Sequence, residues 1–115
     1  MTLGEKQRLF SLLTSKLIMY ANWMGYELTY GETWRDPRIA QLNAQAGSGI
    51  SNSLHLDRLA VDFNLFKDGV FLTRTEDHAP LGAFWKTLHP LCRWGGDFKP
   101  KPDGNHYSIE HDGRK

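Results

Sequence analysis

The sequence predicts a single α+β domain that spans residues 1–115. Three features carry this prediction: an apolar stripe with helical period near the start, an apolar hairpin in the middle, and an irregular order of helices and strands. A chain of 115 residues has the length of one domain, and its 40% hydrophobic and 23% charged residues are typical of a folded globular protein.

The first predicted element is an amphipathic helix over residues 4–24. Thr2 and Glu5 have the spacing of a capping box, in which each side chain accepts a hydrogen bond from the other residue's backbone amide. Gly25 is expected to end the helix. Apolar residues at steps of three or four define one face: Leu9, Leu13, Leu17, Tyr20 and Met24, widened by Phe10, Leu12 and Ala21.

The remaining elements follow from strand composition and turn signals. Residues 26–33 are aromatic and β-branched, which favours a strand. Asp36-Pro37 is typical of a helix start, so a short helix to about residue 46 is predicted, followed by a loop at Gly47-Ser48-Gly49. The second half predicts a strand over 59–66, a turn at Asp68-Gly69, a strand over 70–73, a helix over 75–88 closed by Pro90, a loop over 94–105 and a strand over 106–109.

Composition argues against several classes of function. A net charge of +1 gives no general attraction to nucleic acid, so no nucleic-acid partner is expected. The sequence contains no run of about 18 apolar residues, so insertion into a membrane is not expected. Cys92 is the only cysteine, which excludes a disulfide within the chain and favours a structural thiol. The first residues lack the basic segment of a secretory signal, so we expect synthesis in the cytoplasm.

His55, Asp62 and His106 are candidate ligands of a catalytic zinc ion. Such an ion takes three protein ligands and leaves one position for water, whose pKa drops from about 15.7 to about 7. His55 and Asp62 could reach one metal if a turn near Asp57-Arg58 separates them, and His106 would arrive from the last strand. Asp103, three residues earlier, could then take and return the water proton.

Spacing alone leaves a structural interpretation open. The zinc-protease helix pattern H-E-x-x-H is absent, and a single histidine is more often a hydrogen-bonded structural residue. By the same argument Asp62 could be a strand-end carboxylate and Asp103 a turn residue. His78, His89 and His111 are interpreted as surface or core histidines rather than ligands.

Three motifs occur in a recognisable order. Ser53-x-His55-x4-Ala60-x-Asp62 is followed by Trp94-Gly95-Gly96-Asp97-Phe98 and then by Asp103-x2-His106. This order resembles the D-alanyl-D-alanine carboxypeptidase family of zinc peptidases, with its S-x-H-x4-A-x-D, W-G-G-D-aromatic and D/E-x-x-H segments. Within that family it is most similar to small phage endolysins, which include L-alanyl-D-glutamate endopeptidases. The resemblance covers about residues 25–110.

The resemblance implies a hedgehog/D-Ala-D-Ala-peptidase-like fold, a small antiparallel sheet with packed helices and a zinc cleft. It implies that His55, Asp62 and His106 hold one zinc ion and that Asp103 is the catalytic base. Arg35 is implied to bind substrate or polarise its carbonyl group. The further candidates for substrate binding are Gln41, Ser53 and Trp94, and Ser53 is also expected to fix the ring of His55.

Two positions depart from the family pattern. Arg58 stands where many relatives have glycine, and a side chain there restricts the turn backbone. Tyr107-Ser108 stands where many relatives have an aromatic residue followed by Glu, so an acid near the ligands is either missing or supplied by Glu110.

The function implied by the resemblance is hydrolysis of peptide bonds in peptidoglycan stem peptides, as an L-alanyl-D-glutamate or related endopeptidase of endolysin type. Apart from the peptidoglycan substrate no partner is expected, and the protein is expected to be a monomer. The alternatives are a D-Ala-D-Ala carboxypeptidase and a non-catalytic zinc-bearing cell-wall-binding module, and the intact Asp103 argues against the latter. An endolysin would wait in the cytoplasm of the bacterial host for holin-type release, and a virion-associated protein would use the same chemistry.

Overall fold

The structure is a computed structural model that describes residues 1–34, 36, 38 and 53–115. Helix α1 (Leu3–Trp23) begins with the predicted capping box, because the Thr2 hydroxyl accepts from the Glu5 amide at 3.1 Å and the Glu5 carboxylate accepts from the Thr2 amide at 2.9 Å. Leu12 and Met24 of the predicted stripe are 54% and 40% exposed. The buried face is shifted toward Phe10, Leu13, Leu17 and Ala21, which follow the steps of a single helix face.

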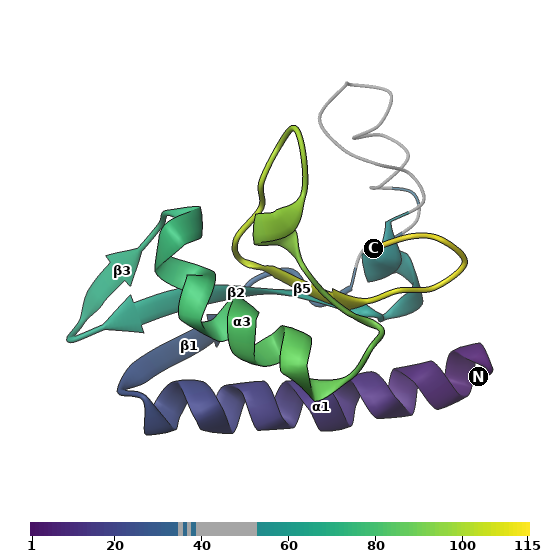
Figure 1. Cartoon of the computed structure of the whole chain (residues 1–115), viewed down its shortest axis with the longest axis horizontal. Coiled ribbons are helices and arrows are strands. Elements are labelled where there is room, and N and C mark those ends of the chain that lie inside the picture. Colours follow the sequence, from purple (N-terminus) through teal and green to yellow (C-terminus); the bar gives the residue numbers. More distant parts are fainter. Residues whose placement is uncertain (35, 37, 39–52) are drawn as a thin grey trace.

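Five strands form one antiparallel sheet in the order β1-β2-β5-β4, and β3 pairs with β2 beside β5 (Figure 1). The strand predicted over 26–33 ends at residue 30. Beyond it the chain still contacts β2, because the Gly31 amide donates to the Asp62 carbonyl and the Asp62 amide donates to the Glu32 carbonyl, each at 2.7 Å. The strands are β1 (Tyr26–Tyr30), β2 (Ala60–Lys67), β3 (Val70–Leu72), β4 (Cys92–Trp94) and β5 (His106–Ile109).

The helix predicted over 75–88 begins as a 3-10 turn, η2 (Thr75–His78), and continues as α3 (Ala79–Leu88). Pro80 in the first turn of α3 fits this start, since proline lacks an amide hydrogen. The short turns η1 (Leu54–Asp57) and η3 (Gly95–Asp97), and strand β4, were not predicted. The helix and loop predicted over 36–49 lie outside the described residues, apart from Asp36 and Arg38.

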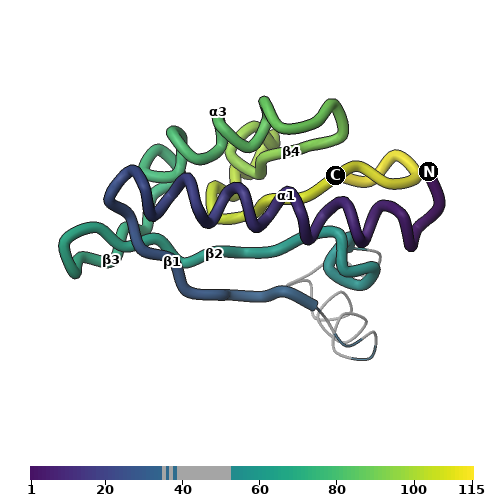
Figure 2. Tube along the Cα trace, turned by 90° about the horizontal axis from the view of Figure 1, so that it is seen from below, coloured from purple at the N-terminus to yellow at the C-terminus, as the bar shows by residue number. Residues whose placement is uncertain are grey.

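Helices α1 and α3 pack on the same face of the sheet, and the core lies there (Figure 2). Trp85 of α3 meets Phe10 of α1 edge to face at 5.8 Å, and it meets Tyr107 of β5 at 6.1 Å. Side chains alternate along a strand, so Phe63 points into this core while Asp62 and Asn64 point to the other face. In the described part of the chain, no helix is long and apolar enough to span a bilayer.

Candidate metal centre

Three side chains from separate elements meet on the sheet face opposite the helices. His55 comes from η1, Asp62 from β2 and His106 from β5. Asp62 and His106 are direct partners in the antiparallel register, which places both side chains on one face. One atom from each of the three residues lies within 4.8 Å of the others.

The spacing of this cluster fits a tetrahedral divalent metal. At zinc-to-ligand distances of about 2.1 Å, two ligands in tetrahedral geometry lie about 3.4 Å apart. Asp62 Oδ1 lies 3.4 Å from His55 Nε2 and 3.5 Å from His106 Nδ1. In the described structure that oxygen is buried without a hydrogen-bond partner, which a bound cation would remedy.

The charge state of the cluster also suits a cation. Burial raises the pKa of Asp62, but the facing imidazoles of His106 and His55 stabilise the carboxylate more strongly and lower its pKa to about 2. Asp62 is therefore ionised at neutral pH. His55 and His106 are 3% and 7% exposed, so their nitrogens are largely withdrawn from water.

Each imidazole turns its second nitrogen toward an oxygen. His55 Nδ1 lies 3.6 Å from Glu32 Oε1, and His106 Nε2 lies 3.3 Å from the Lys115 carbonyl oxygen. A carbonyl oxygen can only accept, so the Lys115 contact favours the His106 tautomer that carries its hydrogen on Nε2. Glu32 is too far from His55 for a hydrogen bond, and its carboxylate faces the ring as a nearby negative charge. Glu32 was missed in the sequence analysis, and the alternative acid Glu110 instead forms an ion pair with Arg93.

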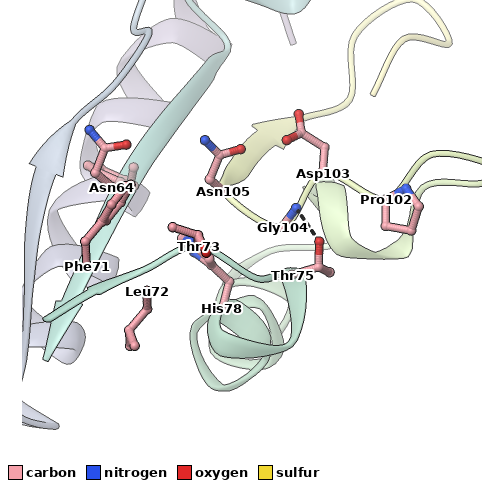
Figure 3. Close-up of a pocket in the computed structure, with 11 residues that line it drawn as sticks. Asn64, Phe71, Leu72, Thr73, Thr75, His78, Pro102, Asp103, Gly104 and Asn105 are labelled. Atoms are coloured by element: carbon pink, nitrogen blue, oxygen red, sulfur yellow. Dashed lines mark hydrogen bonds between the residues drawn. The ribbon is translucent and has the colours of Figure 1, made fainter.

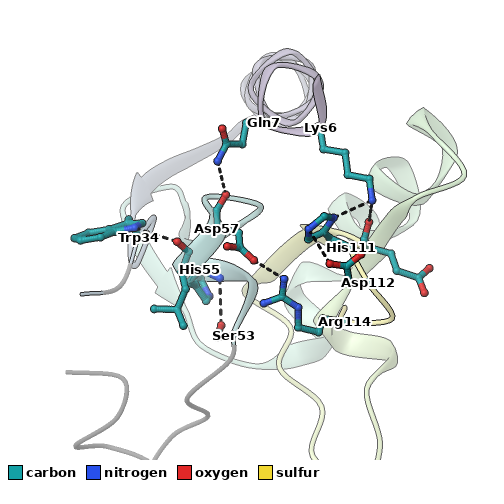
Figure 4. Close-up of polar contacts among 11 residues, drawn as sticks. Lys6, Gln7, Trp34, Ser53, His55, Asp57, His111, Asp112 and Arg114 are labelled. Atoms are coloured by element: carbon teal, nitrogen blue, oxygen red, sulfur yellow. Dashed lines mark hydrogen bonds and ion pairs between the residues drawn. The ribbon is translucent and has the colours of Figure 1, made fainter. Parts of the chain in front are cut away.

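The turn that carries His55 is held by contacts from both ends of the chain (Figure 4). The Ser53 hydroxyl accepts from the His55 backbone amide at 3.2 Å, so Ser53 caps the turn through the backbone rather than through the ring. Gln7 of α1 donates to the Asp57 carbonyl at 2.9 Å, and Arg114 forms an ion pair with the Asp57 carboxylate. A substrate contact by Ser53 stays a prediction.

Arg58 ends the same turn in the left-handed conformation, with φ of 57°. This conformation favours glycine, which fits the glycine that the family resemblance implies at this position. The Arg58 guanidinium lies 5.3 Å from the centre of the Trp34 ring. Arg58 therefore keeps the glycine-type turn and adds a cation–aromatic contact at its outer side.

Asp103 is held beside the cluster by the Trp94-Gly95-Gly96 segment. The Asp103 amide donates to the Gly95 carbonyl at 2.8 Å, and the His106 amide donates to the Asp103 carbonyl at 3.1 Å. Trp94 is 8% exposed, and its indole donates to the Gly104 carbonyl at 2.7 Å. Trp94 thus positions the loop of Asp103, and direct contact with substrate stays a prediction.

The Asp103 carboxyl group is suited to proton transfer. Partial burial raises its pKa, and the negative charge of Asp62 raises it further, while His106 and His55 lower it. A raised pKa brings a carboxylate closer to the neutral range in which a general base works best.

The other histidines have structural contacts of their own. His78 is buried with Nδ1 2.9 Å from the Tyr107 hydroxyl, His89 Nδ1 accepts from the Leu91 amide at 3.1 Å, and His111 Nδ1 lies 3.0 Å from Lys6 Nζ. Burial raises the pKa of Cys92 to about 11, which agrees with a structural thiol. Arg35 and Gln41 lie outside the described residues, so their substrate contacts stay predictions.

The fold and the cluster together define an α+β protein with a His–Asp–His candidate metal site. The family model described as D-alanyl-D-alanine carboxypeptidase matches residues 46–109, and the chain belongs to this peptidase family. A similar solved structure is that of the Serratia marcescens L-Ala D-Glu endopeptidase ChiX. The two chains are 23% identical with a TM-score of 0.72, and the match covers 93% of this chain and 85% of that one. This likeness confirms the predicted fold, and none of the curated proteins matches the chain.

Proposed function

We propose that this chain is a zinc peptidase that hydrolyses peptidoglycan stem peptides, as an L-alanyl-D-glutamate or related endopeptidase. The observation that carries the proposal is the convergence of His55, Asp62 and His106 with the ligand spacing of tetrahedral zinc. Membership of the peptidase family supports the hydrolytic reaction, and the fold shared with an L-Ala D-Glu endopeptidase supports the substrate class.

The proposed zinc ion, Asp103 and Arg35 each have a separate role in hydrolysis. Zinc, when bound, supplies a Lewis acid that polarises the scissile carbonyl and lowers the pKa of water. Asp103 takes the proton from the attacking water and returns it to the leaving amine. Arg35, outside the described residues, is proposed to stabilise the negative oxygen that forms during attack.

An internal peptide bond suits the site better than a terminal one. A carboxypeptidase must hold the free carboxylate at the end of its substrate, for which a cationic side chain is the strongest partner. Among the described residues that line the cavity beside Asp103, there is no lysine or arginine, and burial lowers the pKa of His78. A D-Ala-D-Ala carboxypeptidase is the second candidate, since the family carries that description.

Digestion of purified peptidoglycan, followed by mass analysis of the fragments, tests the activity. The wild type is expected to cut within the stem peptide, whereas release of only terminal D-Ala would indicate the carboxypeptidase. Asp103→Asn is expected to retain zinc and lose about 100-fold or more of the cleavage rate, because it removes the base without changing size. Zinc content is measured on the same samples.

The ligand variants test the metal site. His55→Ala, Asp62→Ala and His106→Ala are expected to lose both zinc and cleavage, while His89→Ala is the matched control that keeps both. Unchanged zinc content in all three ligand variants would contradict the site. Zinc retention by a wild type that cuts nothing would instead indicate the non-catalytic wall-binding module.

We also propose that the protein is made in the cytoplasm of a bacterial host and reaches the wall by holin-type release or as part of a virion. Cultures that produce it alone are expected to keep their turbidity, and cultures that also produce a holin are expected to clear. Clearing without the holin would contradict release of this type.

A further inference from the structure

A cavity of about 330 Å³ lies beside the candidate metal centre, between the β2–β3 hairpin and the loop that carries Asp103 (Figure 3). Asn64 follows Asp62 by two residues on β2, so the two side chains leave the same sheet face about 7 Å apart. Asn105 directly precedes His106, and its carbonyl accepts from the Phe63 amide at 3.0 Å. The cavity therefore begins within two residues of Asp62 and next to His106 in the sequence, although none of the candidate ligands lines it.

The wall of this cavity can form hydrogen bonds but carries little charge. Its polar side chains are the amides of Asn64 and Asn105, the hydroxyls of Thr73 and Thr75, the carboxylate of Asp103 and the imidazole of His78. Burial lowers the pKa of His78, which disfavours its charged form. Figure 3 shows the polar ends of Asn64, Asn105 and Asp103 pointing in the same direction. No lysine or arginine lines the cavity within the part of the chain that the structure describes.

Two hydrogen bonds hold the wall in place. Asn64 Nδ2 donates to the Thr29 hydroxyl at 3.2 Å, which leaves the Asn64 carbonyl oxygen available to a ligand. Thr75 accepts from the Gly104 amide at 3.3 Å, which connects η2 to the Asp103 loop. The cavity is thus built from three elements that the fold fixes against each other.

We infer that this cavity is a specificity subsite that receives the substrate residue next to the scissile bond and selects a carboxamide over a carboxylate. A carboxamide both donates and accepts, as the two asparagine amides do. A carboxylate would instead lie beside Asp103, and no lysine or arginine among the described lining residues would offset the repulsion. An extended peptide advances about 3.4 Å per residue, so a group on the adjacent residue can reach the cavity. The inference rests on the proposed function and specifies its substrate.

Two stem peptides that differ in one group provide the test. In one, the D-glutamate next to the scissile bond has a free α-carboxylate, and in the other that group is an α-carboxamide. The zinc-loaded wild type is expected to cut the amidated peptide with kcat/KM about tenfold higher or more. Equal values, or a preference for the free acid, would overturn the subsite.

Thr73→Lys is the sharpest variant, because Thr73 is an exposed part of the cavity wall and lysine would introduce the missing cation. It is expected to reverse the preference in favour of the free acid. Thr87→Lys on the exposed side of α3 is the matched control and should leave the ratio of the two kcat/KM values unchanged. Asn64→Asp adds a second carboxylate and is expected to increase the preference for the amidated peptide.

The outcomes separate the subsite from the proposed function. If the wild type cuts neither peptide, the proposed function fails and the subsite fails with it. If the wild type cuts both peptides with equal kcat/KM, and Thr73→Lys leaves the two values equal, the subsite alone is overturned and the peptidase activity stands.

Discussion

At the residue scale, the candidate site depends on how two rings are turned. His55 directs Nε2 toward Asp62 and Nδ1 toward Glu32, while His106 directs Nδ1 toward Asp62 and Nε2 toward the Lys115 carbonyl. In both rings one nitrogen is free for a metal only if the other carries the hydrogen. The Lys115 oxygen favours that tautomer in His106, and the Glu32 carboxylate faces Nδ1 of His55 from 3.6 Å.

Glu32→Ala is expected to weaken zinc binding by about tenfold or more, because the ring of His55 loses the carboxylate oxygen that faces its Nδ1. Glu32→Gln keeps an acceptor oxygen and should bind zinc more tightly than Glu32→Ala. Competition with a chromophoric chelator measures the Kd. Glu27→Ala, at an exposed position of β1, is the matched control. An unchanged Kd in Glu32→Ala would remove this role from Glu32.

At the element scale, η3 sets the position of the Asp103 loop through a contact that only glycine allows. A Cβ atom on Gly95 would lie 2.0 Å from the Asp103 carbonyl oxygen and 2.8 Å from the His106 Cβ. Gly95→Ala must therefore push the loop away from β5. We expect kcat/KM to fall by about 100-fold, since a shift of about 1 Å in a catalytic group has that effect.

The matched control for this variant is Gly4→Ala in α1. There the new methyl group would meet only Arg8 Nη1, at an ordinary 3.5 Å, and alanine favours the helix. Thermal unfolding is expected to show a loss of about 1–3 kcal/mol for Gly95→Ala and none for Gly4→Ala. Wild-type kinetics in Gly95→Ala would show that the loop tolerates the methyl group without moving Asp103.

The elements that could be predicted from the sequence are those with local signals. The capping box and apolar period predicted α1, and the Asp68-Gly69 turn predicted the β2–β3 hairpin. Strand β4 has three residues and is defined by its pairing with β5, so no local sequence pattern predicts it. The anchors of η1 were missed for the same reason, because Gln7 and Arg114 lie 50 and 57 positions from Asp57.

At the scale of the whole molecule, the candidate ligands come from three segments that only the fold brings together, so binding of a metal there would be coupled to folding. A ligand at a hundredfold excess over its Kd stabilises the native state by about 2.7 kcal/mol. Added zinc is expected to raise Tm, and a chelator to lower it, in calorimetric scans. His106→Ala should not respond to zinc. A wild-type Tm that is independent of zinc would contradict the coupling.

A second property of the whole molecule is its stability toward acid, which His78 is expected to influence. His78 is 3% exposed, and burial lowers its pKa, although Asp77 acts in the opposite direction. Its Nδ1 lies 2.9 Å from the hydroxyl of buried Tyr107, in the core between η2 and β5. The folded state therefore resists protonation of this ring. In the unfolded chain the ring has the pKa of an ordinary histidine, about 6.5.

The sign of the effect follows from proton linkage. Above the pKa of the unfolded chain the ring is neutral in both states, and its stabilising contribution is complete. Below that pKa the unfolded state binds the proton first, so stability is lost as the pH falls toward the lower pKa of the folded state. Urea unfolding from pH 8 to pH 5 should show this loss in the wild type. His78→Gln keeps a hydrogen-bonding group for Tyr107 but cannot titrate, so the difference in unfolding free energy between the two proteins should shrink below about pH 6.5. All other titrating groups are common to both proteins. Parallel curves of unfolding free energy against pH would therefore mean that His78 takes up its proton as readily in the folded core as in the unfolded chain.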